Sequence, residues 1–434
     1  MKYNTVSAEE AVKVIKDGDR VHFSSVAVTP RILINALVER GRRKEIKGVK
    51  IQHIHTEGTA CYADPEFEGI FHLESFFVGG NVRKQTQAGY ADYIPVFLSE
   101  TQKLIRQGYL KVNVAMIQVS PPDKHGFVSL GTSVDATLAA IESADTVIAQ
   151  VNKYVPRAWG DAMISIKDID IFVEADVPLH VHDNAPITDL ERAIGKNVAE
   201  LVDDGACLQM GIGGIPNAVL AELTNHKNLG VHTEMFSDGL LPLVESGVVN
   251  GKAKQIDKGK IVASFLMGSQ ALYDFIDDNP MVAMMDVAHT NGIHVIRKNH
   301  KVTAINSALS IDITGQVCAD SIGTTFYSGV GGQIDFIRGA GHSEGGKPII
   351  AMPSVTSKGL SKITPTLIEG AGVVTTRANM HWFVTEYGAV NLYGKTLQER
   401  AKLIISIAHP DHREMLDKAA FDRFGPHYRF QGSL

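Results

Sequence analysis

Short apolar runs rich in β-branched residues alternate along this chain with stretches in which apolar positions recur every three to four residues. Runs of the first kind are typical of strands, and stretches of the second kind are typical of amphipathic helices. The clearest predicted strands are residues 21–23, 112–119, 146–151 and 348–352. The clearest predicted helices are residues 30–40, 134–143, 189–202, 216–223 and 396–405. This alternation predicts an α/β architecture with largely parallel sheets.

The pattern also contains an internal repeat. Residues 14–18 read Val-Ile-Lys-Asp-Gly, and residues 201–205 read Leu-Val-Asp-Asp-Gly. In each copy a predicted strand, a loop, a proline and a helix come next, with Pro30 13 residues and Pro216 12 residues after the aspartate of the Asp-Gly pair. Each copy then continues into a predicted strand that ends in His-Thr-Glu, at residues 55–57 and 232–234.

Two matches in the same order predict two related open α/β domains that arose by internal duplication. We place them at residues 1–184 and 185–434, joined near residues 177–186, with a site between the two halves. His180 and His182 lie in this joining segment and could bind a metal. Because histidines in linkers are usually solvated, we interpret them as such and predict no metal.

Composition and charge restrict the function. The 434 residues carry a formal net charge of −6, so no basic field favours nucleic acid, and the basic cluster at 40–44 is interpreted as a helix end. Apolar runs are too short to span a bilayer, and no export segment is visible at the start. The three cysteines are far apart, which favours neither a disulfide framework nor a thiolate metal site. We therefore expect a cytoplasmic protein without nucleic-acid or membrane partners.

Residues 211–216 read Gly-Ile-Gly-Gly-Ile-Pro between a predicted strand and a predicted helix. Glycines at this position let backbone N–H groups approach a phosphate at the helix N-terminus, although a tight turn would need them equally. With Glu234 about 20 residues further on, the segment also imitates a dinucleotide-binding fingerprint. Pro216 replaces the third glycine of that fingerprint and the first copy lacks the glycines, so a dinucleotide-dependent dehydrogenase is a weaker alternative.

Three further segments could carry chemistry. The glycine run at 327–336 could form an oxyanion hole, or it could be a packing loop. Ser343 lies in a Gly-x-Ser-x-Gly sequence, but the predicted strand follows this sequence instead of preceding it, so we do not assign Ser343 as a nucleophile. Glu386 follows the apolar run at 381–384 and could assist at a site or stabilise a turn; we favour the turn.

Several motifs together resemble the acetyl-CoA hydrolase/transferase family, and within it most closely the 4-hydroxybutyrate CoA-transferases. They are HTEMFSDG at 232–239, GIGGIP at 211–216, SGVGGQIDF at 328–336, TEYG at 385–388, SPPDKHG at 120–126 and AHPD at 408–411. The resemblance runs nearly end to end. It implies a NagB/RpiA/CoA-transferase-like fold for both domains and the mechanism of a class I CoA-transferase.

Under this resemblance Glu234 is the catalytic nucleophile, which would form an acyl-glutamyl anhydride and then a glutamyl-CoA thioester. Gly331 and Gly332 would donate backbone N–H groups to the oxyanion, and the CoA site would be lined by Gly211, Ile212, Gly213, Gly214 and Ile215. Periodicity alone does not choose between Glu57 and Glu234; the resemblance and the glycine loop favour Glu234. Glu57 would then be a structural remnant or help to shape the acyl pocket.

The resemblance further implies that coenzyme A is a substrate, with no permanently bound cofactor and no metal. The expected partners are a short acyl-CoA such as 4-hydroxybutyryl-CoA, a carboxylic acid such as acetate, and a second copy of the chain in a homodimer. Butyryl-CoA:acetate transfer and acetyl-CoA hydrolysis are close alternatives, and a CoA or nucleotide sensor is the alternative from outside enzymes. Three lysines are candidates for the CoA phosphates: Lys347, Lys358 and Lys362.

Overall fold

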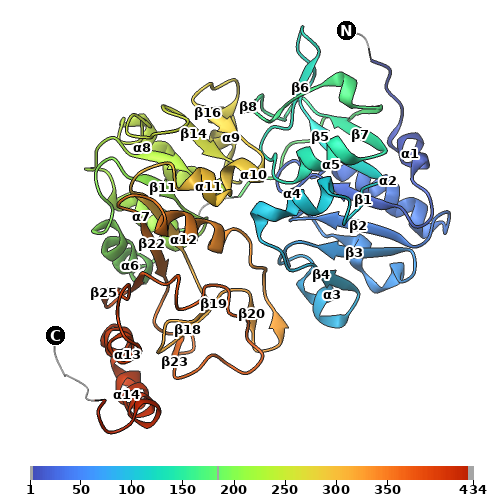
Figure 1. Ribbon diagram of the computed structural model, residues 1–434. Coiled ribbons are helices and arrows are strands. Elements are labelled where there is room, and N and C mark those ends of the chain that lie inside the picture. The colour runs from blue at the N-terminus through green and yellow to red at the C-terminus, as the bar shows by residue number, and fades with distance from the viewer. Residues whose placement is uncertain (1–2, 183–184, 429–434) are drawn as a thin grey trace.

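A computed structural model describes residues 3–182 and 185–428, and shows two α/β halves lying side by side (Figure 1). The N-terminal half contains a sheet of seven strands in the order β10-β7-β5-β1-β2-β3-β4, and all neighbouring pairs are parallel. Their bounds are β1 (Arg20–Phe23), β2 (Val49–His53), β3 (Phe71–Ser75), β4 (Ala91–Tyr93), β5 (Val114–Val119), β7 (Thr146–Val151) and β10 (Ile171–Glu174). Helices α1 (Ala8–Ala11), α2 (Arg31–Arg42), α3 (Arg83–Ala88), α4 (Leu98–Arg106) and α5 (Thr137–Ser143) belong to this half.

The C-terminal half contains a nine-stranded sheet in the order β25-β24-β22-β17-β11-β12-β14-β16-β8. Its strands are β11 (Cys207–Gln209), β12 (Gly230–His232), β14 (Ile261–Ala263), β16 (Val282–Met284), β17 (Val302–Asn306), β22 (Lys347–Ala351), β24 (Trp382–Thr385), β25 (Gly388–Asn391) and β8 (Trp159–Gly160). Without the two edge strands β25 and β8, the remaining seven follow the same order in the chain as the seven strands of the first sheet. This shared order confirms the internal duplication.

The helices of the second half are α6 (Asp189–Ala199), α7 (Gly214–Glu222), α8 (Leu241–Glu245), α9 (Gln270–Ile276), α10 (Val287–Thr290), α11 (Ile293–Ile296), α12 (Gln333–Gly341), α13 (Leu397–Ser406) and α14 (Pro410–Phe424). Short strands form smaller sheets: β6 (Phe127–Ser129) with β9 (Met163–Ser165), β13 (Met235–Phe236) with β15 (Phe265–Leu266), β20 (Ser321–Ile322) with β21 (Thr325–Phe326), and β18 (Ser310–Asp312) with β19 (Val317–Cys318) and β23 (Ile363–Thr364). The strands and helices predicted from the apolar pattern are confirmed, and the basic cluster at 40–44 ends α2.

The two copies of the repeat form equivalent turns before their first strands. Gly18 and Gly205 both adopt left-handed backbone angles, with φ of 79° and 76°, a conformation that glycine adopts without a steric penalty. The preceding aspartates, Asp17 and Asp204, accept hydrogen bonds from the backbone N–H groups of Lys47 and Lys227 at 3.0 and 2.8 Å.

The two His-Thr-Glu tripeptides, in contrast, do not occupy equivalent positions, which corrects the prediction that both copies place the tripeptide at a strand end. His232 is the last residue of β12, whereas β2 ends at His53, before the first tripeptide begins. Counted from the equivalent lysines of the two turns, the first tripeptide starts eight residues after Lys47 and the second five residues after Lys227. Three additional residues therefore displace Glu57 from the position that Glu234 occupies.

One strand crosses between the halves. β8 lies early in the chain but pairs in parallel with β16, through Ala283 with Trp159 and Met284 with Gly160. The predicted boundary between residues 184 and 185 stays a prediction, because residues 183 and 184 lie outside the described residues. Within the described part of the chain, no helix has the length and apolar character needed to cross a bilayer.

Candidate functional site

Glu234 lies two residues after the end of β12, at the carboxyl ends of the central strands of the second sheet, where open α/β sheets commonly bind ligands. Its backbone carbonyl accepts hydrogen bonds from the N–H groups of Ser264 at 2.9 Å and Phe265 at 3.2 Å. The hydroxyl of the preceding Thr233 lies 2.9 Å from the carbonyl oxygen of Met210, at the end of β11. The backbone of Glu234 is thus fixed by both neighbouring strand ends.

The position of His232, which precedes Thr233 and Glu234, is equally constrained. His232 is buried, and its Nε2 lies 2.9 Å from the carbonyl oxygen of Thr290. Burial lowers the pKa of His232 to about 3, so the ring is neutral at physiological pH and Nε2 must carry the proton that it donates to this carbonyl. His232 therefore helps to hold β12 in place and is not available to exchange protons with Glu234.

Glu234 is partly buried, and its carboxylate has few but specific polar partners. Asn291 Nδ2 donates to its Oε2 at 2.9 Å, and the backbone of Gly332 also hydrogen bonds to it. Burial, together with the nearby charge of Asp335, raises the pKa of Glu234 to about 7 despite these two hydrogen bonds. The nucleophile predicted from the sequence is thus a carboxyl group poised to ionise near neutral pH, a property common among catalytic groups.

Asp335 is a neighbour of Glu234 to which the sequence motifs assigned no role. Its carboxylate accepts hydrogen bonds from the backbone N–H of Ser99 at 3.0 Å and from the Ser99 hydroxyl at 2.8 Å. Asn291 Nδ2 also lies 3.4 Å from Asp335 Oδ2, so the amide lies between two acidic side chains. Burial raises the pKa of Asp335 to about 6. Asn291 lies in no motif, so nothing in the sequence indicated it.

The predicted oxyanion glycines lie beside this carboxylate. Gly332 is the N-cap of α12, and a Cβ atom on it would lie 1.9 Å from Glu234 Oε2 and 2.3 Å from Asn291 Nδ2. Gly331 has a φ of 54°, and its carbonyl accepts a hydrogen bond from Leu98 N at 3.0 Å. A side chain at position 332 would displace the carboxyl of Glu234, and the N-terminus of α12 favours negative charge at this point.

Glu234 opens into a cavity of about 350 Å³ that both halves line. The N-terminal half contributes residues such as Ile54, His55 and Phe77, and the C-terminal half contributes residues such as Ile212, Met267 and Gly331. Most of the lining side chains are apolar. Two further lining residues, Val26 and Asp135, have positive φ angles of 46° and 35°, and such backbone conformations in residues other than glycine gather at functional sites. The cavity lies between the two halves, where the sequence predicted a site.

The predicted CoA loop divides between two cavities. Ile212 lines the cavity of Glu234, while Ile212, Gly213 and Gly214 line a second cavity of about 270 Å³. A Cβ atom on Gly211 or Gly213 would meet nothing within 4 Å, whereas one on Gly214 would lie 1.6 Å from Glu191 Oε1. Because the Glu191 carboxylate already lies at the start of α7, it would repel a phosphate at Gly214, and the space for a ligand lies beside Gly211 and Gly213. Ile215 packs against the main core.

The candidate lysines for CoA phosphates are largely engaged elsewhere. Lys347 Nζ forms an ion pair with Asp203 at 2.8 Å and donates to the carbonyl of Leu201 at 2.7 Å. Lys362 Nζ donates to the carbonyl of Ala308 at 3.0 Å. Lys358 is exposed and could move toward a ligand.

Ser343 and Glu386, two further candidates from the sequence, both make structural hydrogen bonds. Ser343 follows α12 and precedes β22, is buried, and donates its hydroxyl to the carbonyl of Asn299 at 2.6 Å. This position confirms that its motif is no nucleophile elbow. Glu386 accepts a hydrogen bond from the backbone N–H of Ser354 at 2.9 Å, so it stabilises the loop after β22, whereas we had expected it to stabilise its own turn.

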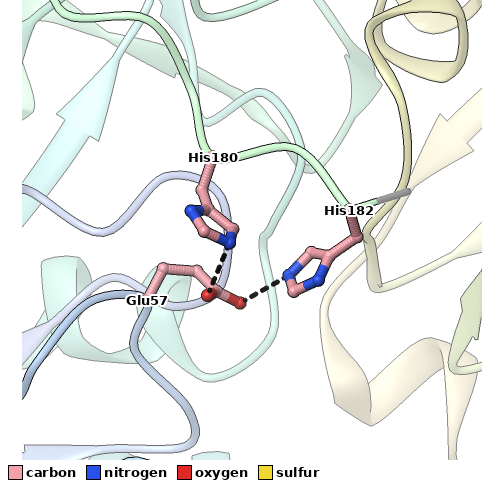
Figure 2. A group of neighbouring side chains, drawn as sticks. All are labelled: Glu57, His180 and His182. Carbon is pink, nitrogen blue, oxygen red and sulfur yellow. Dashed lines mark hydrogen bonds and ion pairs between the residues drawn. The ribbon is translucent and has the colours of Figure 1, made fainter.

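Glu57 points toward the segment that joins the halves. Its carboxylate lies 3.0 Å from Nε2 of His182 and 3.3 Å from Nε2 of His180 (Figure 2). It also lies 3.3 Å from Nε2 of His55. The interpretation of His180 and His182 as solvated linker residues is incomplete, because each is less than half exposed and contacts an acidic side chain from the first half.

Two family profiles and two relatives match this chain over most of its length. Family profiles for the acetyl-CoA hydrolase/transferase N-terminal and C-terminal domains match residues 1–181 and 268–420. The chain is 52% identical over 420 residues to a succinyl-CoA:acetate/propanoyl-CoA:succinate CoA transferase of Fasciola hepatica, covering 96% of this chain and 87% of that protein. It is 48% identical to a 4-hydroxybutyrate coenzyme A transferase of Clostridium kluyveri, covering 98% of each chain.

Two solved structures are also similar to this chain over nearly its whole length. The structure of RipA from Yersinia pestis superposes with a TM-score of 0.93 at 35% identity, covering 97% of both chains. A 4-hydroxybutyrate CoA-transferase structure from Porphyromonas gingivalis superposes with a TM-score of 0.84 at 37% identity, covering 97% of this chain and 98% of that one.

Proposed function

Because this chain belongs to the acetyl-CoA hydrolase/transferase family, we propose that it transfers coenzyme A between a short acyl-CoA and a carboxylate through a covalent intermediate on Glu234. It is a CoA-transferase for which coenzyme A is a substrate and no bound cofactor is needed. The observation that carries the proposal is the partly buried carboxyl of Glu234, with its raised pKa, at the N-terminus of α12 and facing the cavity between the halves.

The chemistry proceeds in two half-reactions. A Glu234 oxygen attacks the thioester carbonyl carbon, the C–S bond breaks, and CoA leaves as the thiolate, which leaves an acyl-glutamyl anhydride. The thiolate then attacks the glutamyl carbonyl carbon, the acid is released as a carboxylate, and Glu234 becomes a glutamyl-CoA thioester. The acceptor carboxylate reverses both steps and takes the CoA, so that Glu234 returns to its free form.

The surroundings of Glu234 suit these steps. A carboxylate whose conjugate acid has a pKa of about 7 is a stronger base, and therefore a better nucleophile, than an ordinary exposed glutamate. In our proposal the N–H groups of Gly331 and Gly332 stabilise the negative oxygen that develops at each tetrahedral stage, where preorganised donors have a large effect on rate. Gly211, Ile212 and Gly213 bind the CoA portion along the open side of their loop, while Gly214 and Ile215 shape the loop.

The cavity, whose lining is mostly apolar, supports a short acyl group, and we propose 4-hydroxybutyryl-CoA with acetate as the acceptor. Butyryl-CoA:acetate transfer is the nearest alternative, since a Butyryl-CoA:acetate CoA-transferase of Anaerostipes caccae is 37% identical to this chain. Water attacking the same intermediate would give acetyl-CoA hydrolysis. A CoA or nucleotide sensor would not need the reactive carboxyl of Glu234. We also propose that the protein acts in the cytoplasm and as a homodimer.

Mass spectrometry of the protein after mixing with 4-hydroxybutyryl-CoA tests the intermediate. We expect a CoA adduct on the peptide that contains Glu234, and its loss when acetate is added, because acetate accepts the CoA. The Glu234→Ala variant should form no adduct, while Glu344→Gln, which changes an exposed carboxylate, should behave as the unmodified protein. An adduct that survives in Glu234→Ala and is lost in Glu57→Ala would assign the nucleophile to the first copy and refute the proposal.

A further inference from the structure

We propose that Glu57, His180 and His182 form a binding site for a divalent transition-metal ion of the zinc type. One ligand atom from each residue lies within 4.8 Å of the ligand atoms of the other two. Figure 2 shows the two imidazole rings pointing toward the same carboxylate. This site is separate from the proposed transferase chemistry, which needs no metal.

The spacing of these atoms suits a zinc ion. His182 Nε2 lies 3.0 Å from Glu57 Oε1, and His180 Nε2 lies 3.3 Å from Glu57 Oε2. Zinc binds histidine nitrogen and carboxylate oxygen at about 2.0–2.2 Å in tetrahedral geometry, which separates neighbouring ligand atoms by about 3.3 Å. An ion can therefore replace the direct contacts with only small rotations of the three side chains.

The segments that carry the ligands are held by other parts of the fold. Tyr273 donates its hydroxyl to the carbonyl of His180 at 2.7 Å, and the backbone N–H of His182 donates to the carbonyl of Gly268 at 2.9 Å. On the other side, the backbone N–H of Glu57 donates to the hydroxyl of Thr29 at 2.9 Å. Because these hydrogen bonds fix both backbones, little conformational freedom remains to be lost when a metal binds.

The charge balance also favours a cation. The carboxylate of Glu57 is only 10% exposed. Its two oxygens lie 3.0–3.3 Å from imidazole nitrogens of His55, His180 and His182. Two neutral imidazoles and one carboxylate form a common donor set for zinc. His55, 3.3 Å from Glu57 Oε1, would remain as the hydrogen-bond partner that orients the carboxylate.

The two histidines are 41% and 44% exposed, so an ion can enter from solvent and complete its coordination with water. At this location a bound ion would link the two halves of the chain. Glu57 belongs to the first half, while the backbone of the histidine segment is bonded to the second half. A bound metal would therefore clamp the two halves together. His182 also lines the second cavity beside Gly213 and Gly214, so the clamp would lie next to the proposed CoA loop.

Cobalt(II) is a suitable probe, because tetrahedral Co²⁺ absorbs visible light and Zn²⁺ displaces it. We expect the full-length protein, freed of any histidine tag, to bind one Co²⁺ per chain with this absorption, and Zn²⁺ to abolish the absorption. The variants His182→Gln and Glu57→Gln should each weaken Co²⁺ binding at least about tenfold, since even outer-shell changes cost 10–100-fold in affinity.

His300→Gln is the matched control. His300 is half exposed, and its Nε2 lies 3.6 Å from Glu344 Oε2. It is therefore a histidine that contacts a carboxylate at a different place on the surface. This variant should bind Co²⁺ as the unmodified protein does, and circular dichroism should show that all variants remain folded. Binding that is absent from the unmodified protein, or that is equally strong in His182→Gln, would overturn the proposal. Neither outcome depends on transferase activity, so the two proposals can fail separately.

Discussion

Glu234 must be ionised to attack a thioester, yet its burial favours the protonated form. The second cause of its raised pKa is the negative charge of Asp335, which shares the Asn291 amide with it. A raised pKa means that the nucleophilic form is lost as the pH falls through about 7. The rate constant kcat/KM for the acyl-CoA should therefore decline below this pH.

Replacing Asp335 with asparagine should shift that decline to lower pH. The variant removes a like charge and keeps a side chain of the same shape, so the pKa of Glu234 should fall. At pH 6, one unit below a pKa of 7, about one tenth of the carboxyl is ionised; the variant's kcat/KM should therefore be several-fold higher relative to its own plateau. A pH profile of kcat/KM for both proteins checks this, and superimposable acid limbs would contradict it.

At the residue level, the sequence led us to propose Glu234 as the nucleophile, but it did not indicate the polar side chains that contact it. Glu234 and the two glycines lie in contiguous motifs. Asn291 contacts Glu234 from a position 57 residues away, and Ser99 reaches Asp335 from 236 residues away. Such contacts arise only when packed elements meet, and neither periodicity nor motif spacing carries that information.

At the scale of elements, the start of α12 restricts where the carboxyl of Glu234 lies. Gly332 has a φ of −98°, which an alanine could also adopt. The requirement for glycine here therefore comes from the 1.9 Å approach of Glu234 Oε2 to the position of a Cβ atom and not from backbone strain.

The variant Gly332→Ala should consequently remain folded and lose activity. Displacing a reacting group by about 1 Å can reduce the rate by about 100-fold, and we expect a loss of at least this size in kcat with a small change in melting temperature. Gly339→Ala, on the same helix, is the control. Its Cβ would lie 2.5 Å from a side-chain atom of Ile296, so it should lower the melting temperature more than the turnover. Similar losses of kcat in both variants would show that the effect comes from the helix as a whole.

The elements themselves were predictable, because their apolar spacing is local. The duplication was also visible, through the Asp-Gly turns. The placement of the first His-Thr-Glu was wrong, because identical residues do not reveal that β2 ends before the tripeptide while β12 ends at its first residue. Glu191, which lies over Gly214, likewise reduced the space for a phosphate that the glycine loop had suggested.

At the scale of the whole molecule, the halves contact each other through polar as well as apolar groups. Arg106 of α4 forms an ion pair with Asp286 at 2.8 Å, and Ser99 of the same helix binds Asp335. The proposed nucleophile in the second half therefore depends on a helix of the first half for the position of its acidic neighbour.

Separating the chain between residues 184 and 185 tests this dependence. The second fragment alone would lack β8 and would expose the edge of β16, and unpaired edge strands promote aggregation. We expect it to be insoluble or inactive by itself and to recover activity when produced together with the first fragment. Co-purification and CoA-transfer assays check this, and an active isolated second fragment would show that the first half is dispensable.

The position of β8 also limits recombination between relatives. Gly160 has a φ of 93°, and a Cβ atom on it would lie 2.6 Å from the carbonyl oxygen of Met284, while Arg157 N donates to Asp277 at 2.7 Å. A chimaera that joins the first half of one family member to the second half of another would therefore bring together a strand and a sheet edge that had never been selected as a pair. The duplicated halves share one topology, but they are no longer interchangeable parts.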